Sequence, residues 1–427
     1  MPLAGPESTS DTPITATMPT AMPITALAMV GPRVRRLRES DSKAIHVTIP
    51  WFTGWAMHMK RLLAAALLGV LAACSDAGTN TDPTSTEATT ALTTQETSAP
   101  ASAKPQPEDV RAKAASLMMV GVSNYDDALA ALNQGAGGIF IGSGTDPNLL
   151  TAPDRNIQAL RKAVGRDFSV SIDFEGGRVL RHQGILGTFP SPQVMAQTMN
   201  PEQVRGMAKA MGDSLLAHGV TVNFAPVADI DAGLDVVGDR AFSADPNIDA
   251  EYATAFAQGM LDAGVRPVFK HFPGHGRASG DSHTGQVFTP PLGDLENIDL
   301  VPYGRINVPG AGVMLGHMVV PDLGAPQNGL PSTLNPAAYQ LLRTGAYRDG
   351  RPFAGVVYTD DLAMGAITGV MPIPQAVVAS LQAGADQALW VTTAGLKEAI
   401  DATVAAVETG TYPRAQFEES VRRVGVV

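Results

Sequence analysis

Residues 201–227, PEQVRGMAKAMGDSLLAHGVTVNFAPV, contain the unit on which the fold depends. From Pro201 to His218 the apolar residues recur at intervals of three and four, and proline suits the first helical turn, so a helix is expected. Gly219 suits the position just after a helix, where a left-handed residue is common. The apolar run Thr221–Val227 is typical of a buried β-strand. The unit is therefore a helix followed by a strand.

The same alternation recurs through the rest of the chain. Eight apolar, β-rich runs are separated by helical patterns such as Ala250–Ala263. The runs are Leu117–Val122, Gly138–Gly142, Phe168–Asp173, Thr221–Val227, Arg266–Lys270, Gly312–Val320, Gly355–Thr359 and Gln387–Val391. Eight strands that alternate with helices predict an α/β fold, a (β/α)8 TIM-type barrel over residues 108–427. An open doubly wound sheet is the alternative.

Composition restricts the class of function. The 427 residues carry a net charge of -11 and contain no strongly basic block, which argues against a nucleic-acid partner. The single cysteine excludes an intramolecular disulfide framework and a cysteine-based zinc cluster. The glycine-rich residues 135–138 precede a predicted strand, whereas a dinucleotide-binding loop follows one. We therefore expect no cofactor.

The first 107 residues have the composition of targeting and tether segments. Residues 1–58 show no amphipathic period and are expected to be a disordered extension, or to lie ahead of the true start codon. Residues 59–74 contain a basic pair, an apolar stretch of 12 residues and small residues before Cys74, an order that resembles a bacterial lipoprotein signal peptide. Residues 75–107, rich in Thr, Ser, Ala and Pro, predict a flexible tether.

These segments predict where the protein resides. We expect an exported protein whose Cys74 is lipidated, so that it is anchored to the cell membrane and faces the cell wall or periplasm. The alternative is that Cys74 is an incidental thiol in an ordinary signal peptide or a short core helix.

Charged residues follow several of the predicted strands. Asp173 ends the third run and Glu175 follows it, Lys270 ends the fifth and His271 follows it, and Asp360 follows the seventh. Because the C-terminal ends of barrel strands carry the active site, these side chains should converge on one mouth. For any single residue, a structural ion pair at the rim is the alternative.

The segment Lys270–His283, KHFPGHGRASGDSH, carries the most specific chemistry. The Pro-Gly pair between His271 and His275 breaks any helix, so the two histidines cannot share a helical face as in a metalloprotease, and a metal site is disfavoured. Asp281 and His283 are two residues apart, so the carboxylate can orient the imidazole. A positioned imidazole of this kind can serve as general acid and base.

These motifs resemble glycoside hydrolase family 3, and specifically its β-N-acetylglucosaminidase branch. The resemblance covers about residues 110–425, and the matching segments are 172–179 (IDFEGGRV), 223–227 (NFAPV), 238–242 (GDRAF), 270–283 and 357–364 (VYTDDLAM). With the lipoprotein signal, the chain resembles a surface-anchored member of the family. We expect a single catalytic domain without the C-terminal α/β sandwich domain that many members carry.

The resemblance implies an exo-acting, retaining enzyme that removes terminal β-linked N-acetylglucosamine by double displacement, with cell-wall muropeptides as substrates. It implies Asp360 as nucleophile, His283 as acid–base and Asp281 as the residue that orients and charges His283. The positions that match sugar-binding residues are Asp173, Arg181, Arg240, Lys270 and His271. From the spacing of the histidines we expect no metal, and we expect a monomer.

Two alternatives stay open for the activity. A histidine acid–base repels phosphate less than a carboxylate would, so phosphorolysis of N-acetylglucosaminides at the same site is one. A non-catalytic sugar-binding lipoprotein is the other, although a pure binder needs neither a nucleophile nor an acid–base.

Two positions carry expectations of their own. Asp361 is the second candidate for the nucleophile, but its side chain is expected on the other face of the strand. Phe174 stands where the branch commonly has a polar residue, which is expected to change the wall of a subsite.

Overall fold

The computed structural model describes residues 107–425, apart from residue 235 and residues 325–328. The predictions for residues 1–58, for the signal segment 59–74 with Cys74 and for the tether up to residue 106 lie outside the described residues. Residue 107 begins the first helix of the barrel domain. Within the described part of the chain, no helix combines the length and the apolar character that a membrane span requires.

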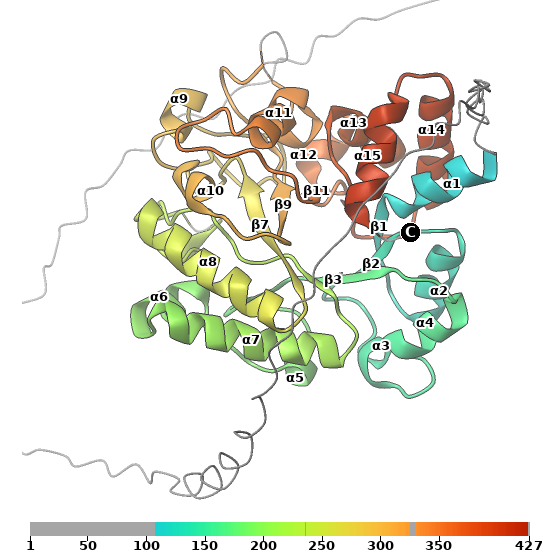
Figure 1. Cartoon of the computed structure of the whole chain (residues 1–427), viewed down its shortest axis with the longest axis horizontal. Helices are drawn as coiled ribbons and strands as arrows, with labels where there is room; N and C mark the ends of the chain where they lie inside the picture. The colour runs from blue at the N-terminus through green and yellow to red at the C-terminus, as the bar shows by residue number, and fades with distance from the viewer. Residues whose placement is uncertain (1–106, 235, 325–328, 426–427) are drawn as a thin grey trace, which may run out of the picture. The chain divides into compact units, whose positions relative to one another are not determined.

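Eight parallel strands form the barrel (Figure 1). They are β1 (Met118–Gly121), β2 (Gly138–Ile141), β3 (Ser169–Ile172), β6 (Val222–Asn223), β7 (Arg266–Phe272), β9 (Gly312–Leu315), β11 (Val357–Thr359) and β12 (Ala388–Trp390). Their order in the sheet follows the chain from β1 to β11, and β12 pairs with β1. A parallel bridge between Tyr358 and Gln387 joins β11 to the start of β12. The predicted α/β barrel and all eight predicted strands are confirmed.

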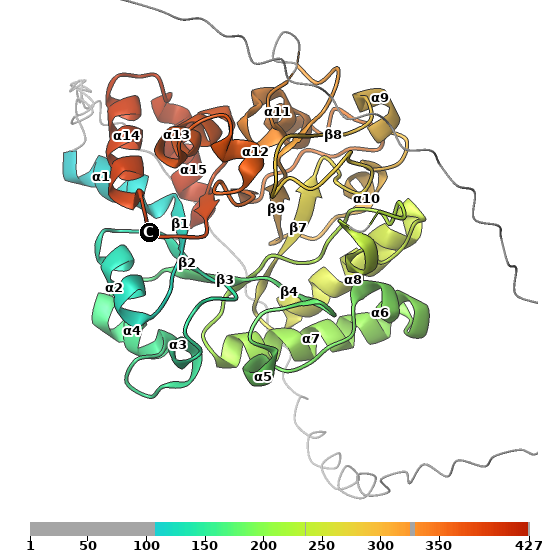
Figure 2. The ribbon, with the colours of Figure 1, turned by 180° about the vertical axis from the view of Figure 1, so that it is seen from behind.

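Helices surround the strands, as the two opposite views in Figures 1 and 2 show. The longer ones are α1 (Pro107–Ser116), α2 (Tyr125–Asn133), α4 (Ile157–Val164), α7 (Pro201–Ala217), α8 (Pro246–Asp262), α11 (Pro336–Thr344), α13 (Ile373–Ala383), α14 (Leu396–Glu408) and α15 (Arg414–Val424).

Short elements lie in the connections. They are α3 (Asn148–Thr151), β4 (Phe174–Gly176), β5 (Val179–Leu180), α5 (Gln183–Leu186), α6 (Pro192–Thr198), η1 (Gly238–Arg240), β8 (Val287–Phe288), α9 (Leu292–Leu295), α10 (Val301–Arg305), β10 (Met318–Val319), η2 (Ser332–Leu334) and α12 (Gly365–Thr368).

Helix α7 begins at the predicted Pro201 and ends before the predicted Gly219, and the structure adds a capping box at its start. Asn200 accepts a hydrogen bond from the Gln203 backbone N–H, and the Gln203 side chain accepts one from the Asn200 N–H, which forms a capping box. After the helix, Gly219 has a φ of 82°, a left-handed conformation that favours glycine. The next helix, α8, begins at Pro246, earlier than the predicted residue 250, because Asp245 caps it by accepting from the Asn247 N–H.

Aromatic side chains fill the barrel interior. The Phe224 ring lies 6.0 Å from the Phe140 ring and 5.4 Å from the Tyr358 ring, measured between centroids. All three side chains are buried, as is Trp390. This packed interior forms the floor below the C-terminal ends of the strands.

Candidate active site

Asp360 follows β11 directly and lines a cavity at the C-terminal ends of the strands. Its Oδ1 accepts a hydrogen bond of 2.8 Å from the Asp361 N–H, and its Oδ2 lies 4.0 Å from Nε2 of His271. Burial by itself would raise the pKa of this carboxyl, but His271, His317 and the Asp361 N–H outweigh it and hold the pKa at about 2. Asp360 is therefore ionised at neutral pH and can act as a nucleophile.

Asp361 lines the same cavity as Asp360, which differs from the expected opposite face. The strand ends at Thr359, so the alternation of faces no longer applies to the two aspartates. Oδ1 of Asp361 accepts from the N–H groups of Ala363 and Val391. Burial and the neighbouring Asp360 raise the pKa of Asp361 to about 6. Its carboxylate is thus bonded to the backbone and is a weaker candidate for the nucleophile.

The candidate acid–base pair lies on the loop after β7. Nδ1 of His283 is 2.7 Å from Oδ1 of Asp281, which also accepts from the His283 backbone N–H at 2.9 Å. Burial opposes ionisation of Asp281, but its hydrogen bonds with His283 lower the Asp281 pKa. An ionised Asp281 binds the Nδ1 side of the ring, which leaves Nε2 of His283 available for proton transfer. His283 is largely exposed and lines the same cavity as Asp360.

The cavity brings together four of the predicted site residues. It has a volume of about 350 Å³ and is lined by Asp173, Arg181, His283 and Asp360 among others. A cavity of this size at the mouth of a barrel suits a small ligand.

The other two predicted cations, Lys270 and Arg240, converge on Glu175. Nζ of Lys270 lies 2.7 Å from Oε1 of Glu175 and 2.7 Å from Oδ1 of Asp173. Arg240 donates two hydrogen bonds to Glu175, from Nε at 2.7 Å and from Nη2 at 2.8 Å. Glu175 is fully buried, and although burial opposes its ionisation, Arg240 and Lys270 lower its pKa well below the usual range. The network fixes the side chain of Asp173 at the cavity.

Asp229 is a site residue that the sequence reasoning missed. It is buried, and its Oδ2 lies 2.6 Å from Nδ1 of His271. Its carboxylate also accepts from the backbone N–H groups of His271 and His275. Asp229 therefore fixes the His271 ring so that Nε2 faces Asp360. Its position two residues after the run that ends at Val227 was the available signal.

Two buried contacts fix the rest of this loop. Nε2 of His275 lies 3.3 Å from Oγ of Ser282, next to the acid–base pair. Arg277 donates from Nε to the buried carboxylate of Asp299 at 2.8 Å. His275 and Arg277 thus hold the loop in its position in this structure.

The expectation for Phe174 is wrong. Its side chain is fully buried and packs edge to face against Phe189, with ring centroids 5.7 Å apart. It belongs to the short strand β4, where its neighbour Glu175 bears the charge network. An aromatic residue at position 174 therefore contributes to the core and does not line the cavity.

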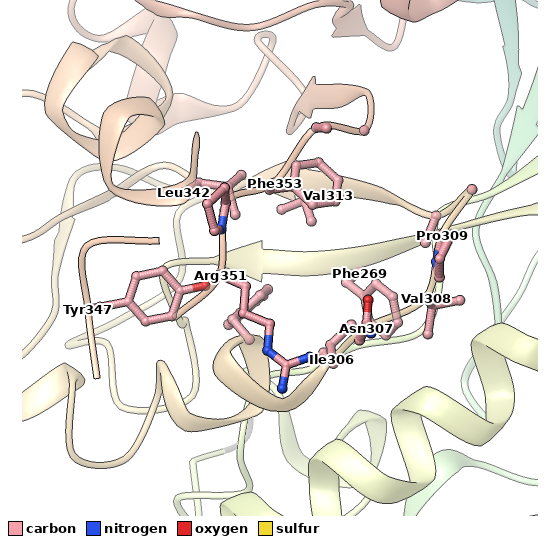
Figure 3. A pocket seen from close by; sticks show the side chains of 16 residues that line it. Phe269, Ile306, Asn307, Val308, Pro309, Val313, Leu342, Tyr347, Arg351 and Phe353 are labelled. Atoms are coloured by element: carbon pink, nitrogen blue, oxygen red, sulfur yellow. The ribbon is translucent and has the colours of Figure 1, made fainter. Parts of the chain in front are cut away.

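A separate cavity of about 390 Å³ lies near the N-terminal ends of β9 and β11 (Figure 3). Its lining is mostly apolar and includes Phe269, Tyr347 and Phe353, with Arg351 as a charged member. Because the carboxylates and histidines described above lie at the other ends of the strands, this cavity is not the candidate active site. Among the described residues, no group of three or more His, Cys, Asp or Glu side chains is arranged to hold a metal ion.

Comparison with known proteins assigns the family. The profile described as "Glycosyl hydrolase family 3 N terminal domain" matches residues 109–427. The chain belongs to glycosyl hydrolase family 3. The motifs that carried the resemblance are therefore those of a glycoside hydrolase, and the aspartates and histidine at the barrel mouth belong to an enzyme.

Individual relatives agree with this assignment. The chain is 42% identical over 386 residues to the β-hexosaminidase LpqI of Mycobacterium tuberculosis, which covers 87% of this chain and 98% of that protein. Among solved structures, a family 3 glycosyl hydrolase from Mycobacterium smegmatis is 45% identical, with a TM-score of 0.70, over 74% of this chain and 95% of that chain. The solved structure of LpqI is 44% identical with a TM-score of 0.69, over 74% of this chain and 92% of that chain.

Proposed function

We propose that this glycoside hydrolase is an exo-acting, retaining β-N-acetylglucosaminidase that releases terminal β-linked N-acetylglucosamine. The observation that carries the proposal is that Asp360 and His283 line one cavity. One is an ionised carboxylate, and the other is an imidazole bonded to Asp281 through Nδ1. The name of the relative LpqI, a β-hexosaminidase, supports the choice of sugar.

The proposed reaction has two steps. In the first, Asp360 attacks the anomeric carbon while Nε2 of His283 donates a proton to the glycosidic oxygen, so that the aglycone leaves as an alcohol and a glycosyl-enzyme forms. In the second, His283 removes a proton from water, and the oxygen of that water attacks the anomeric carbon and releases Asp360. The charge on Asp281 stabilises the imidazolium in both steps.

The sugar is held at the charged side of the cavity. Asp173 and Arg181 line the cavity directly, and the Lys270–Glu175–Arg240 network lies behind Asp173. Paired donors and acceptors of this kind orient hydroxyl groups, and Nε2 of His271 points toward the nucleophile. We propose that the predicted sugar-binding residues hold the hydroxyl and N-acetyl groups; they are Asp173, Arg181, Arg240, Lys270 and His271.

The test is hydrolysis of 4-nitrophenyl N-acetyl-β-glucosaminide by the full-length protein, with the corresponding glucoside as the comparison. We expect release of nitrophenol from the N-acetyl sugar and its loss in Asp360→Ala and in His283→Ala. The retained configuration of the product would be read by proton NMR. A folded protein that binds the sugar without turnover would overturn the proposal and favour the sugar-binding alternative.

Phosphorolysis is a second candidate because the acid–base is a histidine. A carboxylate in its place would repel an incoming phosphate more strongly. Product analysis with and without inorganic phosphate decides between the two. Free sugar in both conditions supports hydrolysis, whereas sugar 1-phosphate formed only with phosphate supports a phosphorylase.

The cellular setting is also a proposal. We propose that Cys74 is lipidated and that the exported, monomeric enzyme acts on muropeptides of the cell wall while anchored to the cell membrane. The basic, apolar and small-residue order of residues 59–74 supports this. Mass spectrometry of the protein from membranes would find a lipid mass in wild type and not in Cys74→Ala. Light scattering would report the oligomeric state, and a soluble wild-type protein of unprocessed mass would contradict the anchor.

A further inference from the structure

A second cavity adjoins the candidate active site at the barrel mouth. It has a volume of about 430 Å³ and lies where β1, β2 and β12 end. Phe140, Gly142, Gly144 and Val391 line both cavities, so the two adjoin one another. Val391 has an exposed fraction of 47%, which is high for an apolar side chain. An exposed apolar residue between two polar cavities suits contact with the hydrocarbon face of a sugar or aryl group.

The second cavity lies at strand ends that a leaving group could reach from the candidate active site. Asp173 and Arg181, the sugar-holding residues, follow β3, and the network behind them reaches β7. β1 lies on the other side of β2 from β3 in the ring of strands. Asp360 follows β11, next to the start of β12. A terminal sugar held by Asp173, with its anomeric carbon at Asp360, spans the mouth from the β3 side to the β11 side, and β12 and β1 are the strands that follow β11 in the ring.

A single carboxylate sets the charge of the second cavity. Asp127 is partly exposed and lines it, and among the described lining residues none is basic. Oδ2 of Asp127 accepts from the N–H and the hydroxyl of Ser123, at 2.8 and 2.9 Å, and Oδ1 accepts from Oγ1 of Thr393 at 2.7 Å. These neutral donors hold the carboxylate in place, and among the described residues no basic side chain forms an ion pair with it.

We propose that this cavity is the leaving-group subsite and that Asp127 selects aglycones that are neutral or cationic next to the scissile bond, against anionic ones. The inference rests on the proposed function of the adjoining cavity. Among cell-wall fragments, it favours a leaving group whose lactyl carboxyl is blocked by an amide bond over one with the free acid. Coulomb attraction and repulsion across a partly solvated cavity supply the preference.

The test uses three aryl N-acetyl-β-glucosaminides that differ in the para substituent, which is a carboxylate, a carboxamide or an aminomethyl group. The full-length wild type and Asp127→Asn are compared by kcat/KM for each. Because the intrinsic reactivity of each leaving group is the same in both proteins, the ratio of wild type to variant isolates the effect of Asp127. We expect the preference for the cationic over the anionic aglycone to fall by roughly threefold to tenfold in the variant, and wild-type preference to shrink at high salt.

Asp126→Asn is the matched control. Asp126 is the preceding residue in α2, but it is paired with Arg155 and does not line the second cavity. Asp126→Asn removes one negative charge, as Asp127→Asn does, but should keep the wild-type preference for the cationic aglycone. If Asp127→Asn does not fold, Thr392→Lys decides, because it adds a cation to the lining of the same cavity and should favour the carboxylate aglycone.

The outcomes separate the two proposals. Turnover of all three glycosides with the same preference in wild type and Asp127→Asn, or no change in Thr392→Lys, overturns the role of Asp127 while the proposed activity stands. No turnover of any of them by folded wild type overturns the proposed function and this inference with it.

Discussion

At the scale of single residues, the bond between Asp281 and His283 predicts a dependence on the leaving group. Removing the charge in Asp281→Asn should lower kcat for glycosides of poorly acidic alcohols by about 100-fold, because protonation by His283 then limits the rate. The 2,4-dinitrophenolate group can leave without taking up a proton. The rate at which its glycoside forms the glycosyl-enzyme should therefore change little. A loss of the same size for both substrates would indicate a general structural defect. Steady-state and burst kinetics provide the measurement.

Asp361 predicts a pH-dependent stability at the same scale. Its pKa of about 6 in the folded protein lies above the ordinary value of 3.8, because burial and Asp360 disfavour the charged form. The folded state therefore binds the proton more tightly than the unfolded state does. Protonation of Asp361 thus contributes stability that is present below about pH 4 and is lost as the pH rises through about 6. Asp361→Asn should raise the free energy of unfolding by about 2 kcal/mol at pH 8 and by little at pH 4. Urea unfolding at the two pH values tests this, with the exposed Asp154→Asn as control.

At the scale of elements, Glu175 connects β4, η1 and β7. It accepts from Arg240 in η1 and lies 2.7 Å from Nζ of Lys270 in β7, and it is fully buried. Glu175→Gln removes the carboxylate that pairs with Arg240 and leaves the buried Lys270 with Asp173 alone, so it should lower the free energy of unfolding by about 3 kcal/mol. The exposed Glu251→Gln in α8 should change it by less than about 0.5 kcal/mol. Equal effects of the two substitutions would contradict the structural role of the network.

At the scale of the whole molecule, Asp386 links elements beside the seam where β12 joins β11. Its buried carboxylate accepts from the Val357 N–H of β11 and pairs with Arg343 of α11 and with Arg423 of α15, so it connects elements on both sides of β12. Asp386→Asn should lower the free energy of unfolding by about 3 kcal/mol. Because closure involves the whole ring of strands, unfolding in urea should stay a single transition with a lower midpoint.

Asp401 is the matched control for this prediction. It is exposed and pairs with Arg111 across α14 and α1, which also joins the two ends of the barrel. A surface pair contributes about 0 to 1 kcal/mol, so Asp401→Asn should have a small effect. Two separate transitions in Asp386→Asn would show that the barrel does not unfold as one unit.

The fold and the outline of the site could be predicted from the sequence because both depend on local patterns. Eight apolar runs separated by helical periods define the strands, and the residues that follow them, such as Asp173, Lys270 and Asp360, reach one mouth through the topology of a barrel. The pair Asp281 and His283 is close along the chain, so its hydrogen bond was also predictable.

Contacts between distant segments were decided only by the tertiary structure. Asp229 orients His271, which lies 42 residues later, and Glu175 joins Arg240 to Lys270 across three elements. Phe174 faces the core instead of the cavity because β4 is a short strand of its own, and Asp361 joins the cavity because β11 ends before it. The composition and spacing of a sequence determine which residues follow a strand. The direction of each side chain depends on where a strand ends and on partners that only the closed barrel brings within reach.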